Sequence, residues 1–195
     1  MPTRPRIYLA GPEVFLPNAL EIAAAKRELC ARAGFEGRFP LDAQVDLEGL
    51  AGDEKARRIA LADEGLMLEC DLAIANLTPF RGVSMDSGTA YEVGFMRARG
   101  CRVLGYTNLP EDYNVRADAF RAARRGARPR WPEHGDVAGV EVEDFGLAEN
   151  LMIEIAIRES GGTVVRTAVA PGSELTDLAG FGRCLEQATA LCLPR

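Results

Sequence analysis

The fold is decided by residues 71–100, which read DLAIANLTPFRGVSMDSGTAYEVGFMRARG. This stretch opens with a short apolar run, breaks into a loop containing Pro79, Gly82 and Gly88, and resumes with a helical pattern. The run is almost continuously apolar, as is typical of a strand whose sheet is covered by helices on both faces. Glu92 lies near the start of the predicted helix, so we expect its carboxylate just beyond the end of a buried strand.

The flanking segments repeat the same alternation of strand and helix. Short apolar runs predict further strands at residues 6–10, 37–41, 101–106 and 163–165. Helical spacing of apolar residues predicts helices over residues 18–34, 52–69, 89–99, 149–159 and 175–193. The alternation indicates an open parallel α/β sheet, and 195 residues suit a single domain spanning residues 1–195.

Residues 108–142 interrupt this order with a long excursion that we expect to contain one short helix. Excursions of this length in compact domains are often functional. Together with residues 42–48, the excursion is expected to shape the pocket of any ligand bound at the sheet.

Charge and composition exclude several classes of partner. The chain has 29 acidic and 23 basic residues, a net charge of −6, which argues against nucleic acid and against an anionic membrane surface. No apolar run reaches the roughly 18 residues that a membrane span requires. Its five cysteines are far apart and His134 is the single histidine, so we expect no metal site and a reduced, cytoplasmic location.

Two carboxylates of the central stretch are candidates for chemistry. Ligands of open α/β sheets bind at the carboxyl ends of the strands, where Glu92 and the loop before it are expected. A helix N-terminus favours the ionised form of Glu92, which suits a nucleophile or base, and Asp86 can accept hydrogen bonds from sugar hydroxyls. The structural alternative is that Glu92 is only a charge near a helix N-terminus and Asp86 only a turn residue. Asp71 opens the predicted strand and is expected at the opposite end of the sheet.

The loop after the first strand is the second candidate region. Gly11 and Pro12 make a sharp turn but lack the glycine pattern of a phosphate loop. Phe15 is suited to stack against a flat apolar ring, and core packing is the alternative. Arg81, in the central loop, is the basic residue expected in the same cleft.

Four blocks of the sequence resemble the nucleoside 2-deoxyribosyltransferases. In chain order they are IYLAGPEVF (7–15), DLAIANLTPFRG (71–82), DSGTAYEVG (86–94) and FGLAENLM (145–152). The resemblance implies a flavodoxin-like (Rossmann-like) three-layer sandwich with a central parallel sheet of about five strands. It also implies a homo-oligomer whose sites are completed across subunits.

The same resemblance implies roles for individual residues. Glu92 matches the catalytic nucleophile, Tyr8 a residue that orients it, and Asp86 the carboxylate that binds the deoxyribose hydroxyls. Asp71 matches the acid that assists the nucleobase, which conflicts with its expected place at the start of a strand. Asn150 and Met152 match the segment that a neighbouring subunit contributes to the sugar site.

The implied activity is transfer of 2-deoxyribose between nucleobases, with deoxynucleosides and free nucleobases as substrates. The mechanism would be a retaining double displacement through a covalent deoxyribosyl–glutamate ester, as in retaining glycosidases, without a metal or organic cofactor.

Two alternatives remain. A 2-deoxynucleoside 5-monophosphate N-glycoside hydrolase needs a phosphate site, and residues 11–17 contain neither serine nor a basic residue, although Arg81 lies in the presumed cleft. A non-catalytic nucleotide-binding sensor has no need for a paired Asp86 and Glu92.

Overall fold

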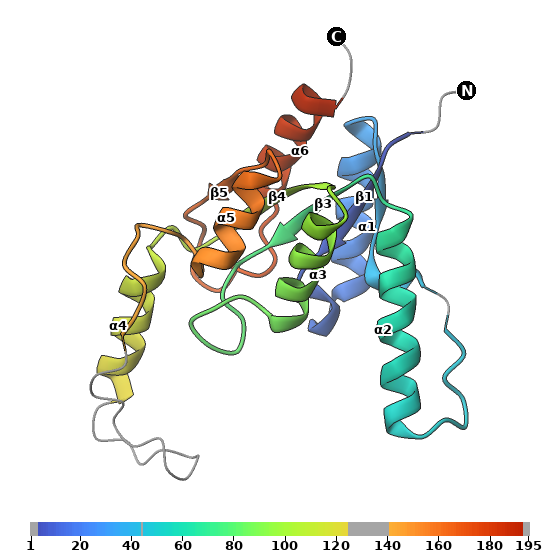
Figure 1. Cartoon of the computed structure of the whole chain (residues 1–195), viewed down its shortest axis with the longest axis horizontal. Helices are drawn as coiled ribbons and strands as arrows, with labels where there is room; N and C mark the ends of the chain where they lie inside the picture. Colours follow the sequence, from blue (N-terminus) through green and yellow to red (C-terminus); the bar gives the residue numbers. More distant parts are fainter. Residues whose placement is uncertain (1–3, 44, 125–140, 193–195) are drawn as a thin grey trace.

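The computed structural model describes residues 4–43, 45–124 and 141–192 (Figure 1). Strands and helices alternate along most of this chain. In order they are β1 (Arg6–Ala10), η1 (Pro12–Phe15), α1 (Ala19–Arg32), β2 (Glu36–Arg38), η2 (Pro40–Asp42), α2 (Gly52–Leu68), β3 (Leu72–Asn76), α3 (Ser87–Ala98), β4 (Arg102–Thr107), α4 (Tyr113–Arg124), α5 (Leu151–Glu159), β5 (Val164–Arg166) and α6 (Ala179–Cys192).

The five strands form one parallel sheet in the order β2-β1-β3-β4-β5. This is the strand order of flavodoxin-like folds, and it confirms the predicted parallel α/β sheet of five strands. Because the order reverses between β1 and β3, the loops that follow these two strands diverge at their carboxyl ends.

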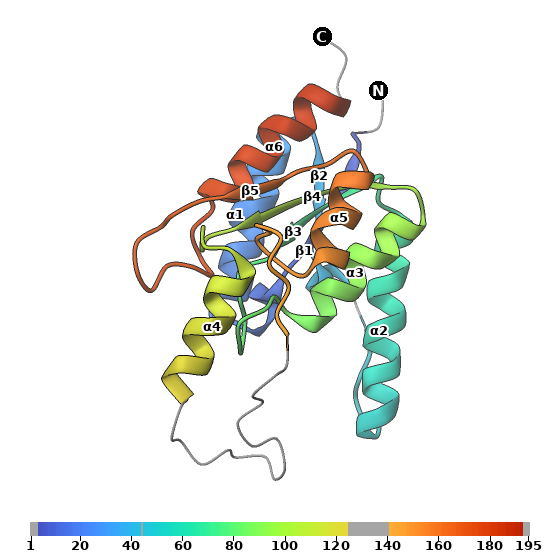
Figure 2. The same ribbon diagram turned by 60° about the vertical axis from the view of Figure 1, so that its left-hand side comes forward.

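Helices cover both faces of the sheet, and the alternation of side chains along β1 shows how. Ile7 and Leu9 belong to a core shared with Phe181 of α6 and with α1, whereas Tyr8 and Ala10 belong to the opposite core, shared with α2, α3 and α5. Figure 2 shows α1 and α6 on one side of the sheet and α3 and α5 on the other. The central strand β3 is buried throughout, as its apolar run predicts.

Two predicted elements differ from the observed ones. The second strand ends at Arg38 rather than residue 41, because Pro40 has no N–H for the sheet and begins a 3₁₀ turn instead. The final helix begins at Ala179 rather than near residue 175. At this start, the Asp177 carboxylate accepts a 2.8 Å hydrogen bond from the Ala179 N–H.

The excursion after β4 contains the one expected helix within its described part, α4. The Tyr113 N–H at the start of α4 donates to the carbonyl of Leu147 at 2.8 Å, which fixes the helix to the segment before α5. The rest of the excursion, with His134, lies outside the described residues. Over the described ranges, no helix combines the length and apolar character that crossing a membrane requires.

Candidate functional site

The centre of the candidate site is a hydrogen bond between β1 and α3. The Tyr8 hydroxyl donates to Glu92 Oε1 at 2.7 Å. Tyr8 is fully buried, because its position in β1 directs the ring into the core beneath α3. Glu92 is partly buried and lies in the second turn of α3. A rigid phenol thus fixes the position of a carboxylate that retains access to solvent.

The surroundings of this carboxylate favour its neutral form. The pKa of Glu92 is raised to about 8, mainly by burial and further by the negative charges of Asp63, Asp86 and Glu13. The hydrogen bond from Tyr8 acts in the opposite direction and lowers this pKa. Burial and the Glu92 charge raise the pKa of Tyr8, so the phenol remains a donor. A carboxylate poised in this way gains from any positive charge that develops beside it.

Asp63, on α2, belongs to this site and was missed from the sequence. Burial raises its pKa to about 6, and its charge acts on both Tyr8 and Glu92. A signal was present in the sequence. Asp63 precedes the buried Met67 by four residues, so it lies on the core-facing side of α2. A carboxylate is unusual at such a position unless it has a functional or structural role.

Asp86 is the N-cap residue of α3. Its Oδ2 accepts hydrogen bonds from the Thr89 N–H at 3.1 Å and from the Thr89 hydroxyl at 3.3 Å. The structural alternative for Asp86 is therefore realised, since the cap satisfies a free N–H at the helix start. Both capping bonds use Oδ2, which leaves Oδ1 as an acceptor for a ligand hydroxyl.

Gly11 and Pro12 connect β1 to the short turn η1, next to the site. A Cβ added to Gly11 would overlap Glu13 Oε2 and would lie 3.0 Å from the Cβ of Asn76. Glycine is therefore needed because two buried side chains approach its backbone. Pro12 is buried as the first residue of η1 and directs the chain away from the sheet.

Glu13 was also missed from the sequence. Its fully buried carboxylate forms an ion pair with the fully buried Lys26 of α1. Oε1 further accepts from Asn76 Nδ2 at 2.9 Å and from the Tyr106 hydroxyl at 3.0 Å. These bonds join the ends of β1, β3 and β4 to α1, and they hold the loop that borders the site.

An aromatic platform, made of Phe15, Phe80 and Arg81, lies on the surface formed by two loops. The Phe15 and Phe80 rings are stacked with centroids 5.6 Å apart and planes 13° apart. The Arg81 guanidinium carbon lies 4.5 Å from both ring centroids. Phe15 is 53% exposed, so it is not an ordinary core residue. The two rings and the Arg81 guanidinium contact one another, and stacking of Phe15 against a ligand ring stays a prediction.

Asn150 and Met152 lie at the start of α5. Asn150 is the N-cap: its Oδ1 accepts from the Met152 N–H at 3.0 Å, and its Nδ2 donates to Glu143 Oε1 at 2.8 Å. These bonds hold Asn150 to its own segment and not to Glu92. Met152 is 71% exposed and points away from the core of its own chain.

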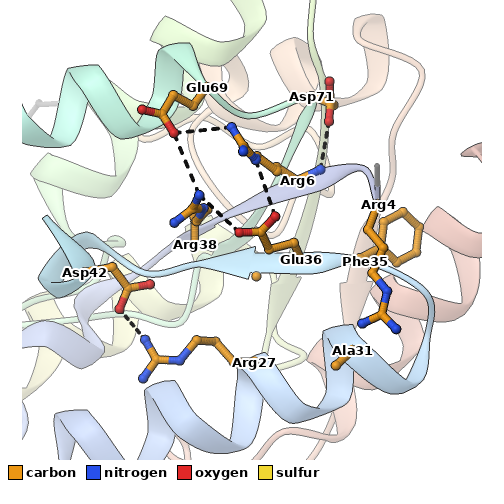
Figure 3. A pocket seen from close by; sticks show the side chains of 11 residues that line it. Arg4, Arg6, Arg27, Ala31, Phe35, Glu36, Arg38, Asp42, Glu69 and Asp71 are labelled. Carbon is orange, nitrogen blue, oxygen red and sulfur yellow. Dashed lines mark hydrogen bonds and ion pairs between the residues drawn. The ribbon is translucent and has the colours of Figure 1, made fainter. Parts of the chain in front are cut away.

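Asp71 is not brought to Glu92. β3 begins at Leu72, one residue after the predicted start, so Asp71 precedes it at the amino end of the sheet. Its Oδ2 accepts from the Arg6 N–H at 2.7 Å, and its own N–H donates to the Arg6 carbonyl at 2.9 Å. Figure 3 shows this exposed carboxylate at a cavity of about 800 Å³ among ion-paired Arg6, Glu36 and Glu69. This placement corrects the expectation of a nucleobase-assisting role and indicates that Asp71 fixes the starts of β1 and β3.

No candidate metal site is found among the residues that the structure describes. Within these ranges, no group of three or more His, Cys, Asp or Glu side chains is arranged to hold an ion. The polar side chains that the structure brings together around Glu92 are carboxylates and a phenol.

Comparisons with known proteins point to one family. The family model described as nucleoside 2-deoxyribosyltransferase matches residues 7–152. The uncharacterised protein C191.05c of Schizosaccharomyces pombe is 39% identical over 169 residues, covering 82% of this chain and 80% of that protein.

Solved structures share the fold. The 2-desoxiribosyltransferase from Leishmania mexicana aligns with a TM-score of 0.59 at 24% identity, covering 93% of this chain and 97% of that one. A conserved protein from Enterococcus faecalis V583 aligns with a TM-score of 0.57 at 22% identity, covering 95% and 99%. At these identities the structural likeness shows the fold alone.

Proposed function

Because the chain belongs to the nucleoside 2-deoxyribosyltransferase family, we propose that it transfers 2-deoxyribose between nucleobases through a covalent ester of Glu92. The observation that supports this most strongly is the 2.7 Å hydrogen bond from a buried Tyr8 to a partly buried Glu92. It holds a carboxylate at a fixed place beside the loops where a ligand of this fold binds.

In the first step, ionised Glu92 attacks the anomeric carbon of a deoxynucleoside. The N-glycosidic bond breaks as the ester bond forms, and the sugar passes through an oxocarbenium-like transition state. The neighbouring charges that disfavour ionised Glu92 in the free protein stabilise the positive charge of this transition state. The departing nucleobase leaves with the electron pair of the broken bond and needs a proton.

Asp63 is the group that we assign to supply this proton, in place of Asp71. Its pKa of about 6 keeps a protonated fraction near neutral pH, and its charge acts on both Tyr8 and Glu92. Such general acid assistance is typically worth about 10²–10⁴-fold in rate. In the second step, a new nucleobase attacks the anomeric carbon, gives its proton back to Asp63, and releases Glu92. No metal or organic cofactor takes part in either step.

The remaining residues bind the substrate in this proposal. Asp86 Oδ1 accepts a hydrogen bond from a deoxyribose hydroxyl, while Oδ2 caps α3. The nucleobase packs on the aromatic platform, with Gly11 and Pro12 forming the adjoining turn. Asn150 and Met152 of the partner subunit complete the sugar site, which agrees with the exposure of Met152 in its own chain.

Base exchange tests the proposal directly. Incubation with deoxyadenosine and free cytosine should give deoxycytidine and adenine, and Glu92→Ala should abolish both products while the protein stays folded. Release of adenine from dAMP, with no exchange between nucleosides, would instead support the monophosphate hydrolase. Absence of turnover with any nucleoside or nucleotide would support a sensor.

A further inference from the structure

A second buried carboxylate, Glu149, contacts the loop that leads into α3. Its Oε1 accepts from the Ser84 hydroxyl at 2.6 Å and from the Asn150 N–H at 2.9 Å, and its Oε2 accepts from the Met85 N–H at 2.8 Å. Glu149 is 1% exposed. Ser84 and Met85 are the two residues immediately before Asp86, the candidate for sugar binding. Glu149, which is distant in the sequence, therefore holds the end of the loop that leads to Asp86.

Arg116 of α4 holds the same loop from a second side. Its Nε donates to the carbonyl of Val83 at 3.2 Å, and its Nη2 donates to the carbonyl of Ala148 at 2.6 Å. Nη2 also lies 3.8 Å from Glu149 Oε2, so it offsets the buried negative charge. Glu149 and Arg116 together contact three consecutive residues, 83–85, next to Asp86.

The rest of this loop is held at the surface, where Phe80 and Arg81 stack with Phe15. Arg81 and Gly82 are exposed, whereas Met85 is buried. The Phe80 N–H donates to the Ser84 carbonyl at 2.9 Å, which closes the loop on itself without tying it to the core. The position of Asp86 relative to Glu92 therefore depends on residues 83–85 and on the start of α3.

We propose that Glu149 is a positioning residue that holds Asp86 at the distance from Glu92 at which it binds the sugar. This role rests on the transferase function proposed above. Displacement of a binding group by about 1 Å can cost about 100-fold in rate, so the bonds from Glu149 matter although it touches no substrate.

Glu149→Gln separates this role from a purely structural one. The amide keeps the shape of the side chain but has a single oxygen, so in either orientation one backbone N–H, that of Met85 or that of Asn150, faces the NH₂ and loses its acceptor. We expect kcat/KM for a deoxynucleoside to fall by about 10- to 100-fold. In an Asp86→Asn background the same change should cost less than about threefold, because the group that Glu149 positions is already impaired.

Glu154→Gln is the matched control. Glu154 is also almost fully buried in the same region, and it accepts from the Ala148 N–H at 2.6 Å and from Arg158. Its hydrogen bonds within the described ranges do not include residues 83–86. We expect it to lower the free energy of unfolding like Glu149→Gln, while the kcat/KM stays within about twofold of wild type and is additive with Asp86→Asn.

Hydrogen exchange gives a readout that does not depend on activity. The Met85 or the Asn150 amide should exchange at least about tenfold faster in Glu149→Gln than in wild type or Glu154→Gln, because one of the two loses its acceptor. Additive effects of Glu149→Gln and Asp86→Asn on kcat/KM, or unchanged exchange at both Met85 and Asn150, would overturn the positioning role. A wild-type protein that transfers no deoxyribose would refute the transferase function instead, and the exchange data would still decide whether Glu149 holds the loop.

Discussion

Glu92 carries two opposing requirements at the scale of a single residue. A nucleophile must be ionised, yet burial and three nearby carboxylates raise its pKa to about 8. Tyr8 counters this with a hydrogen bond from a fully buried ring. In the proposed mechanism, this balance leaves a reactive carboxylate that the developing positive charge on the sugar stabilises further.

Replacing Tyr8 by Phe should raise the pKa of Glu92, because the hydrogen bond that lowers it is lost. The rising limb of kcat/KM against pH should move about one unit toward higher pH, and the rate at neutral pH should fall about tenfold. Tyr91→Phe is the matched control on α3, since the Tyr91 hydroxyl binds Glu64 on the surface. A limb that moves equally in both variants, or in neither, contradicts the role of Tyr8.

Glu92→Gln should change stability in a pH-dependent way. Between about pH 4.5 and pH 8 the folded protein keeps a proton on Glu92 that the unfolded chain releases, so wild-type stability falls as pH rises through this window. The glutamine variant lacks this loss. Relative to wild type, its free energy of unfolding in urea should be about 4 kcal/mol higher at about pH 8.5 than at about pH 5, because the part of the window between them spans about three pH units at about 1.4 kcal/mol each. Equal differences at the two pH values are incompatible with a raised pKa.

At the scale of elements, the ends of the parallel strands bring the site together. β1 contributes Tyr8 and the turn at Gly11, and the loop after β3 leads to Asp86 at the start of α3. The ion pair of Glu13 and Lys26 ties η1 to α1 beneath this region. Loops that are otherwise exposed are therefore anchored by buried polar groups.

Lys26→Met should lower the free energy of unfolding by about 3–5 kcal/mol, because it leaves the Glu13 carboxylate buried and unpaired. The double variant Glu13→Gln/Lys26→Met should lose less than the single one, since no buried charge remains and the new amide oxygen can still accept from Asn76 and Tyr106. Urea unfolding of the two single variants and the double variant measures this coupling. Strict additivity of the two changes would show that the pair does not interact.

The sequence predicted these elements better than the contacts between them. The apolar runs located the strands of the parallel sheet, and the helical spacing of apolar residues located the helices between them. Asp63 and Glu149 were not assigned roles, because each meets the site through contacts between segments far apart in the chain. The role of Asp71 followed from a resemblance, whereas the strand pattern placed Asp71 at the amino end of the sheet, where the structure has it.

At the scale of the whole molecule, the question is whether one chain contains a complete site. Asn150 caps its own α5 and is held by Glu143, while Met152 and Phe145 nearby are exposed apolar side chains. Surfaces of this kind are typical of contacts between subunits. The proposed sharing of sites predicts a functional consequence of mixing subunits.

Glu92→Ala and Asn150→Ala subunits should each have little activity alone and regain it when mixed. A mixed oligomer contains sites in which Glu92 comes from one subunit and Asn150 from its partner, so both groups are intact. Co-expressed and refolded mixtures can be assayed by base exchange, with each variant alone as the control. A mixture no more active than the separate variants would show that sites are not shared.

The most direct measurement of the central claim is detection of the sugar ester on Glu92. Wild-type protein is mixed with deoxyadenosine, quenched in acid within a turnover and digested with trypsin, which releases residues 82–97 as one peptide. Mass spectrometry should find one deoxyribosyl group on this peptide, localised by fragmentation to Glu92 and absent in Glu92→Gln. Rapid base exchange with the peptide unmodified, or with the sugar on another residue, would contradict the proposed double displacement.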